Sequence, residues 1–145
     1  MKEGFYLRLL GLLSDKKYRH AYAKIGRLSL DMDVADDSYK RAKGLMYRKK
    51  MQEARGMLFI FNSERRYSFW MLNMQFSIDI LWLDRNMRIV DITRNVEPAY
   101  SILGAKNYSP SKPAMYVIET CSGFADSSGI KPGYKIRLEF KRSAP

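Results

Sequence analysis

The chain has little of the chemistry that most catalytic and metal sites use, with one cysteine, Cys121, and one histidine, His20, among 145 residues. A lone cysteine excludes an intramolecular disulfide, which suits a reducing compartment, and a free cysteine is most often a small buried hydrophobe. A zinc site needs three or four suitably spaced ligands, which these two residues cannot supply in the usual sets. A catalytic Ser-His-Asp or Cys-His arrangement would have to recruit His20 from outside the apparent core. We therefore predict no metal, and an enzyme is not favoured.

Phosphate-cradling motifs and membrane spans are also missing from the sequence. Neither a Walker sequence nor a Gly-x-Gly-x-x-Gly turn occurs, so nucleotide-dependent chemistry is not indicated. The leucine-rich stretch at residues 7–13 is interrupted by Arg8, is too short to span a bilayer and is followed by no small-residue cleavage site. These absences predict a cytoplasmic protein with no cofactor and no transmembrane segment.

Acidic residues are few relative to basic ones, because 15 Asp and Glu against 26 Lys and Arg give a formal net charge of +11. The excess is concentrated within residues 1–30, which hold seven basic and two acidic residues. A basic balance raises the prospect of a polyanionic partner, although many small basic proteins are simply soluble. One hypothesis assigns the charge to nucleic acid or an anionic membrane surface, with apolar contacts from Phe5, Leu9 and Leu12. The basic residues of this hypothesis are Lys16, Lys17, Arg19, Lys24 and Arg27.

Short segments with strand-like patterns dominate the rest of the chain. Residues 28–34 alternate apolar and polar side chains, which predicts a half-buried strand. Residues 56–61 are apolar on both parities, which predicts a strand buried on both faces. Residues 38–47 place apolar side chains at helical spacing after capping residues, which predicts a short amphipathic helix. Further strands are expected at 67–73, 78–84, 87–94, 115–120 and 134–141.

The number and length of these segments predict an α+β domain that is mainly β. We expect a compact sandwich-like or barrel-like domain of about seven short strands with one or two short helices, because βαβ units would need longer helices between strands. The turn chemistry of residues 84–86 joins two of the strands as a hairpin. We assign residues 25–145 to this single domain and residues 1–24 to a basic N-terminal extension.

The stretch from Phe69 to Ile80 places lone polar groups in a run that is otherwise almost wholly apolar. Burying a polar group without a partner costs about 1–3 kcal/mol, so Asn73 and Asp79 each need a bonded partner or a ligand. With the indole of Trp70 nearby, these residues are candidates for a binding site. The alternative is that both side chains bond backbone groups at a loop, as Asx residues commonly do.

Two further pairs of charged residues are candidates for the same region. Arg41 and Arg48 are seven residues apart, which on a helix would place both on one side. There they could clamp an anion or tie a carboxylate such as Asp79 to the helix. Asp79 and Glu119 both border apolar strands, and two converging carboxyl groups could serve as general acid and base.

Several ordered blocks of the chain carry a family resemblance. They are Arg41-x-x-Gly44-Leu45-Met46-x-Arg48, Gly56-Met57-Leu58-Phe59-Ile60-Phe61, Phe69-Trp70-Met71-x-Asn73, Ile78-Asp79-Ile80, and a closing segment with Val117-Ile118-Glu119, Gly123 and Gly129-Ile130-Lys131-Pro132-Gly133. Through these blocks, over roughly residues 28–140, the chain resembles the domain-of-unknown-function 192 family of small archaeal and bacterial proteins. The resemblance implies a compact β-rich fold with short helices and no established activity. Leu72 and Met74 stand where the family often has Lys and Thr, which reduces the polar equipment for catalysis.

The sequence therefore predicts a small-ligand or partner-binding module with its site near Trp70, Asn73 and Asp79. Arg41, Arg48 and Glu119 are the further candidates for ligand binding. Two alternatives stay open, a hydrolase-like enzyme that uses Asp79 and Glu119, and a polyanion or membrane-surface binder that uses the basic N-terminal segment.

Overall fold

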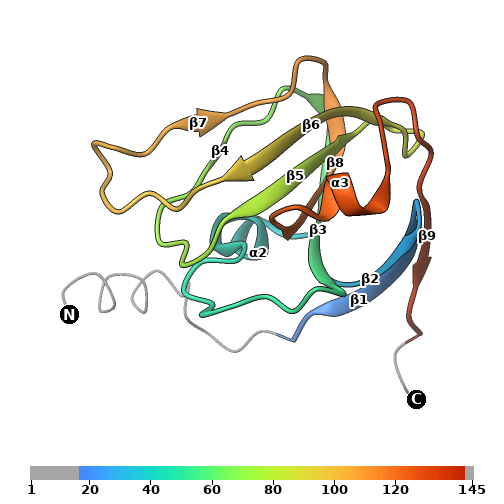
Figure 1. Cartoon of the computed structure of the whole chain (residues 1–145), viewed down its shortest axis with the longest axis horizontal. Coiled ribbons are helices and arrows are strands. Elements are labelled where there is room, and N and C mark those ends of the chain that lie inside the picture. The colour runs from blue at the N-terminus through green and yellow to red at the C-terminus, as the bar shows by residue number, and fades with distance from the viewer. Residues whose placement is uncertain (1–16, 143–145) are drawn as a thin grey trace.

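The computed structural model describes residues 17–142 as nine strands and two short helices (Figure 1). Seven strands form one sheet. Their order in space is β6 (Ile89–Val96), β5 (Ile78–Leu83), β8 (Ala114–Cys121), β3 (Arg55–Arg65), β2 (Leu28–Ala35), β1 (Arg19–Ile25) and β9 (Arg137–Phe140). The remaining elements are the paired strands β4 (Phe69–Trp70) and β7 (Asn107–Tyr108), helix α2 (Ser38–Lys43) and helix α3 (Phe124–Ser128). The expectation of a mainly β, α+β domain is confirmed.

The sheet curls until its two ends approach each other, but it is not closed into a barrel. Strands β2 and β3 are parallel, with α2 in the connection between them, and the other pairs of the sheet are antiparallel. The segment that precedes β9 reaches the start of β6. There the Ile89 amide donates to the Tyr134 carbonyl at 2.9 Å, and the Gly133 amide donates to the Ile89 carbonyl at 2.7 Å. These bonds connect the two ends without continuous strand pairing.

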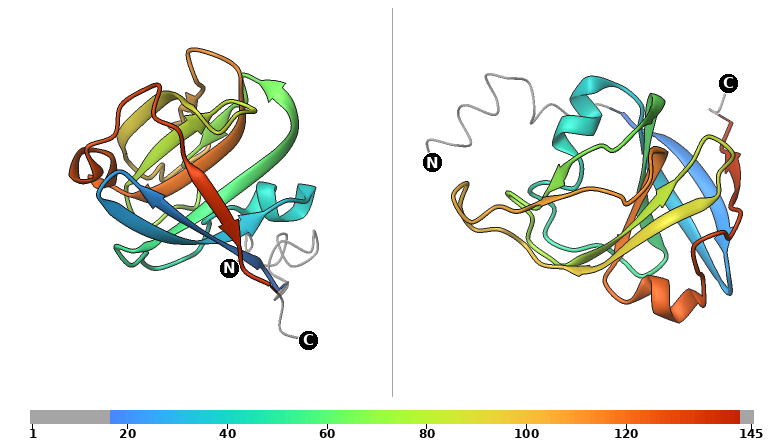
Figure 2. Two further views of the ribbon diagram at one scale, coloured as in Figure 1. Left: turned by 90° about the vertical axis from the view of Figure 1, so that its right-hand side faces the viewer. Right: turned by 90° about the horizontal axis from the view of Figure 1, so that it is seen from above.

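Each face of the sheet carries its own hydrophobic core, because alternate residues of a strand point to opposite faces. The first core includes Leu58 of β3 and Ile118 of β8, and it packs beneath α3. The second core includes Met57 and Val117 from the same two strands and is covered by Leu45, which follows α2. Helices α2 and α3 accordingly lie on opposite sides of the sheet (Figure 2). The prediction that residues 56–61 form a strand buried on both faces is confirmed.

The predicted extension over residues 1–24 is wrong for its last part. Residues 19–25 form β1, which pairs with β2 on one side and β9 on the other. Ala21, Ala23 and Ile25 of this strand are buried in the first core, while Lys24 is exposed. Because alanine carries little hydrophobic signal, this strand was hard to distinguish from a basic extension. The domain therefore begins at or before Arg19.

Several predicted elements are shorter in the structure, and the backbone shows why. The Asp37 carboxylate caps α2 by accepting from the Lys40 amide at 2.7 Å, and the helix ends at Lys43 rather than at residue 47. Gly44 follows with φ +49° and ψ −132°, a conformation that only glycine adopts readily and that cannot continue a helix. The predicted strand 67–73 narrows to β4, and a left-handed residue, Asn73 with φ +61°, turns the chain after it.

No helix within residues 17–142 has both the length and the apolar character needed to cross a membrane.

Candidate functional site

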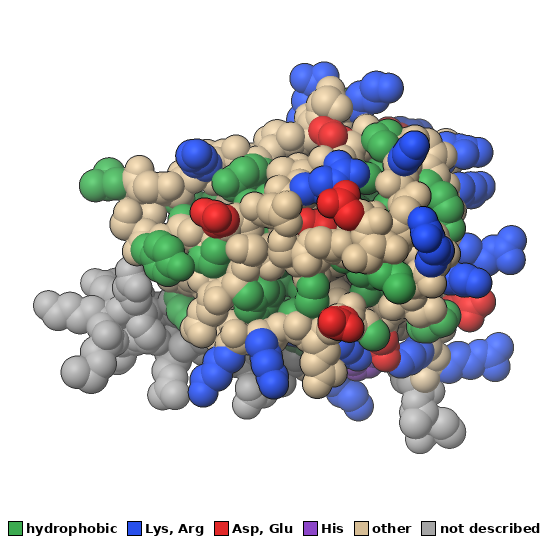
Figure 3. Space-filling model, in the orientation of Figure 1, with side chains coloured by type: hydrophobic (Ala, Val, Ile, Leu, Met, Phe, Trp, Pro, Cys, Tyr) green, Lys and Arg blue, Asp and Glu red, His purple; other side chains and the backbone are tan. Residues whose placement is uncertain are grey.

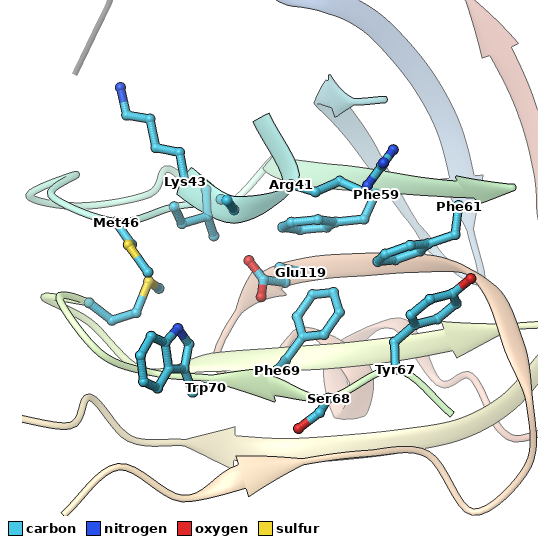
Figure 4. Close-up of a pocket in the computed structure, with 14 residues that line it drawn as sticks. Arg41, Lys43, Met46, Phe59, Phe61, Tyr67, Ser68, Phe69, Trp70 and Glu119 are labelled. Carbon is cyan, nitrogen blue, oxygen red and sulfur yellow. The ribbon is translucent and has the colours of Figure 1, made fainter. Parts of the chain in front are cut away.

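A cavity of about 280 Å³ opens between α2, the strands β3 and β4, and the central strand β8 (Figure 4). Its volume lies just below the range for small-molecule sites, about 300–1,000 Å³. The side chains that define it include Arg41, Phe59, Phe61, Phe69, Trp70 and Glu119. The cavity therefore combines five aromatic side chains with aliphatic ones, two basic residues, Arg41 and Lys43, and one carboxyl group, Glu119.

The aromatic wall is held together by ring contacts. The Phe59 and Phe69 rings meet edge to face at 5.0 Å between centroids, and Phe69 makes a second such contact with the buried Trp82 at 5.3 Å. Phe61 and Tyr67 stack at 3.7 Å. Trp70 is 44% exposed at the mouth of the cavity. The rings thus form a packed wall with one accessible indole.

Gly44 lets the chain after α2 approach this wall closely. A Cβ atom at Gly44 would lie 3.3 Å from the tip of the Phe59 ring, and the positive φ of this residue also favours glycine. The glycine of the Arg41-x-x-Gly44 block is therefore explained by the shape of the cavity wall.

Glu119 is the buried polar group of the cavity. It lies in the middle of β8, and its directly opposite neighbours are the buried Met57 on β3 and Ile80 on β5. Its side chain lies among the cavity-lining residues and is 6% exposed. Among residues 17–142, its carboxyl group has no hydrogen-bond partner. Burial raises the pKa of Glu119 to about 8, while the charge of Arg48 acts in the opposite direction.

Arg41 contributes to the cavity, but its guanidinium is already engaged. Its Nη1 atom donates to the Ile60 carbonyl at 2.9 Å, and the guanidinium lies 5.3 Å above the Phe61 ring. Arg41 therefore fastens α2 to β3 along the aromatic wall, which is a structural contact at the edge of a binding site.

Arg48 does not join Arg41. Its Nη1 atom donates to the Asp33 carboxylate at 2.9 Å, and Asp33 is also bound by Arg55 at 3.2 Å. The predicted tie between an arginine and a carboxylate therefore exists, but with Asp33 rather than Asp79. Because α2 ends at Lys43, the helical spacing that would have aligned Arg41 with Arg48 does not apply.

Asp79 is a structural residue on the other face of the sheet. It is 1% exposed and accepts hydrogen bonds from the amides of Asn95 and Ala125, both at 2.9 Å. It thereby fastens the end of β6 and the start of α3 to β5. This confirms that the lone carboxylate bonds backbone groups.

The pairing of Asp79 with Glu119 as acid and base is wrong. Glu119 lies opposite Ile80 in the register, whereas Asp79 lies opposite Thr120. Directly opposite residues share a face and successive residues alternate, so the two carboxyl groups point to opposite faces of the sheet. The hydrolase-like alternative loses the residue pair on which it depended.

Asn73 shapes the turn beside the cavity but does not line it. Its carbonyl accepts from the Tyr47 amide at 3.0 Å, which links the turn after β4 to the segment after α2. Of the six predicted site residues, the structure thus brings together Trp70, Arg41 and Glu119. It separates Asn73, Asp79 and Arg48 from them. Sequence reasoning missed the phenylalanines of the wall, although Phe59 and Phe61 alternate along a predicted strand.

A second cavity of about 490 Å³ lies near Leu28, Glu53 and Cys121. The Cys121 thiol is half-buried and contacts the Met51 carbonyl at 3.2 Å. Burial raises its pKa, and the charge of Glu53 adds to the rise, so the thiol is not activated as a nucleophile. Within residues 17–142, no group of three His, Cys, Asp or Glu side chains is arranged to hold a metal ion.

The basic side chains surround the visible face of the molecule without merging into one patch (Figure 3). Arg19 pairs with Asp36 at 3.0 Å, while Lys17, Lys24 and Arg27 are exposed. Lys16 and the apolar residues Phe5, Leu9 and Leu12 lie outside the described residues. A polyanionic partner stays a prediction.

The fold and the cavity define a small β-rich domain with a buried carboxyl group in an aromatic pocket. The chain belongs to the domain-of-unknown-function 192 family, described as "Uncharacterized ACR", whose sequence profile matches residues 21–138. The predicted resemblance is confirmed. Among its relatives, a UPF0127 protein of Pyrococcus horikoshii is 32% identical over 76% of this chain and 87% of its own length. A UPF0127 protein of Thermococcus sibiricus is 34% identical over 77% of this chain and 69% of its own length.

Two solved structures share the fold. A protein of Sinorhizobium meliloti described as a candidate transcription regulator has a TM-score of 0.76 and 29% identity, covering 88% of this chain and 98% of its own. A protein of unknown function from Novosphingobium aromaticivorans has a TM-score of 0.74 and 28% identity, covering 86% of this chain and 88% of its own. The family is therefore uncharacterised, and the cavity has to be interpreted from its own chemistry.

Proposed function

We propose that the protein is a small-ligand-binding module whose site is the aromatic cavity, with Glu119 as its polar anchor. The observation that carries the proposal is the Glu119 carboxyl group, which belongs to a side chain only 6% exposed, faces the cavity and has no hydrogen-bond partner among residues 17–142. A buried polar group without a partner costs about 1–3 kcal/mol. A ligand group that bonds Glu119 would supply the partner that the carboxyl group lacks within the described residues.

The composition of the cavity supports binding more than catalysis. Small-molecule sites combine apolar and aromatic walls with few well-placed polar groups, and Phe59, Phe69 and Glu119 fit that description. General acid–base catalysis by two carboxyl groups would need a partner for Glu119, and Asp79 faces away. Trp70 at the mouth offers a surface against which a planar ligand can stack.

A thermal-shift screen of the full chain against a panel of small metabolites tests this proposal. Ala42 is exposed on the α2 rim of the cavity, so Ala42→Phe should fold normally and obstruct entry. The matched control is Ser127→Phe, which adds the same ring beside the second cavity. A ligand of the proposed site stabilises the wild type and the control but not Ala42→Phe. If both variants keep the thermal shift, or if both lose it, the ligand does not bind in the proposed cavity. If no compound of the panel stabilises the wild type, the proposed function is wrong.

A further inference from the structure

If the aromatic cavity binds a small ligand, as the proposed function holds, the charge of that ligand should complement Glu119. We infer that the cavity selects an organic cation, such as a protonated amine on a small apolar or aromatic frame, whose ammonium group pairs with Glu119 between the aromatic rings.

The anionic group of the cavity lies on a strand in the interior of the sheet. Glu119 occupies an interior position of a central strand, and both opposite neighbours, Met57 and Ile80, are apolar. An unpaired carboxylate in such a place is costly, and the charge of a ligand cation offsets that cost directly. A neutral ligand can only hydrogen-bond the carboxyl group, and an anionic ligand would be repelled by its ionised form.

Aromatic rings lie around this carboxyl group. Phe59, Phe69 and Trp70 lie around Glu119 in the cavity (Figure 4). Aromatic rings attract cations through their quadrupole, and a desolvated cation gains more from this contact than an exposed one. An aromatic wall with a carboxyl group among its rings therefore favours an ammonium group over a neutral group of the same size.

The nearby protein cations are already engaged elsewhere or point away. Arg41 donates to the Ile60 carbonyl and lies over Phe61. Arg48 is paired with Asp33 at 2.9 Å, although its field still reaches Glu119. Lys43 extends away from Glu119 into the solvent side of the cavity (Figure 4). A cationic ligand can therefore serve as the counter-ion of the Glu119 carboxylate.

This mode of recognition couples binding to a proton. Burial keeps the pKa of Glu119 near 8, so in the free protein at neutral pH the carboxyl group is mainly protonated. A protonated amine pairs with the carboxylate form, so the Glu119 proton leaves to solvent when the ligand enters. Only protein molecules with a deprotonated Glu119 can pair with the ammonium group. The affinity of the protein for the amine should therefore rise about fiftyfold from pH 6 to pH 8.

The experiment titrates benzylamine into the full chain and follows the indole N–H signal of Trp70 by NMR, with the buried Trp82 as internal reference. Benzyl alcohol and benzoate, which keep the ring and change the charge, are titrated in parallel. We expect benzylamine to bind at least tenfold more tightly than either at pH 8. Glu119→Gln should remove this preference and the pH dependence, while the exposed Glu139→Gln keeps both.

The outcomes separate the inference from the proposed function. If benzyl alcohol or benzoate binds the cavity as well as benzylamine does, the cation preference is wrong and the binding function stands. If none of the three probes moves the Trp70 signal and the metabolite screen is also negative, both are wrong. Should Glu119→Gln not fold, the wild type decides alone, because an affinity that is constant between pH 6 and pH 8 contradicts the pairing with Glu119.

Discussion

Replacement of Glu119 by glutamine should stabilise the protein, and the gain should grow with pH. The folded protein holds the Glu119 proton up to a pKa of about 8, whereas the unfolded chain releases it near the usual value of 4.5. Between these values the folded state binds more protons, so the contribution of Glu119 to stability is lost as the pH rises. The slope is about 1.4 kcal/mol per pH unit midway between the two pKa values and flattens near each of them, which gives about 3.5 kcal/mol between pH 5 and pH 8.

Urea unfolding of the wild type and Glu119→Gln at pH 5, 6, 7 and 8 measures this effect. The difference in the free energy of unfolding between the two proteins isolates Glu119 from every other titrating group. Glu139→Gln is the matched control, because Glu139 is an exposed glutamate on a strand, and its difference from wild type should stay constant. A constant difference for Glu119→Gln over the same range would refute the reasoning, because it would mean that Glu119 is well solvated or already paired.

Three other variants probe the elements that hold the site and the sheet. Asp79→Asn should lower the free energy of unfolding by about 2–4 kcal/mol in urea titrations. Each carboxylate oxygen of Asp79 accepts from one backbone amide, and the NH₂ group of asparagine cannot replace one of these oxygens as an acceptor. The affinity for benzylamine should stay unchanged. Gly44→Ala should lower the free energy of unfolding by about 1–3 kcal/mol, because residue 44 has a positive φ and the added Cβ atom would lie against the Phe59 ring. The same variant should also weaken ligand binding. Deletion of residues 1–24 should abolish the cooperative thermal transition, because it removes nearly all of β1, whereas an intact transition would show that β1 is dispensable.

The strands that bury large apolar side chains could be predicted from the sequence. Residues 56–61 and 78–84 are correctly predicted as strands, because most of their positions hold large apolar side chains on both parities, although β3 continues to Arg65. Strand β1 was not predicted, because its inward side chains Ala21 and Ala23 are small and its outward side chains are polar or aromatic. The end of α2 at Lys43 depended on the conformation of Gly44, which the helical pattern of the following residues concealed.

The site was only partly predictable, because strand pairing decides which carboxyl groups meet. Asp79 and Glu119 resemble each other as isolated acids in apolar strands, and only the register places them on opposite faces. The partner of Arg48 is Asp33, from a strand whose alternating pattern indicated a solvated acid. Trp70 and Glu119 were both candidates, but their convergence on one cavity required the tertiary structure.

The central claim is that Glu119 is a buried carboxyl group that binds a cationic ligand. Its most direct test is an NMR titration of the Glu119 side-chain carboxyl carbon in the free protein and in the presence of saturating benzylamine. We expect the free carboxyl group to titrate near pH 8 and the titration to move down by at least one pH unit when benzylamine is bound. A free titration near 4.5, or a titration that benzylamine leaves unchanged, would contradict the account.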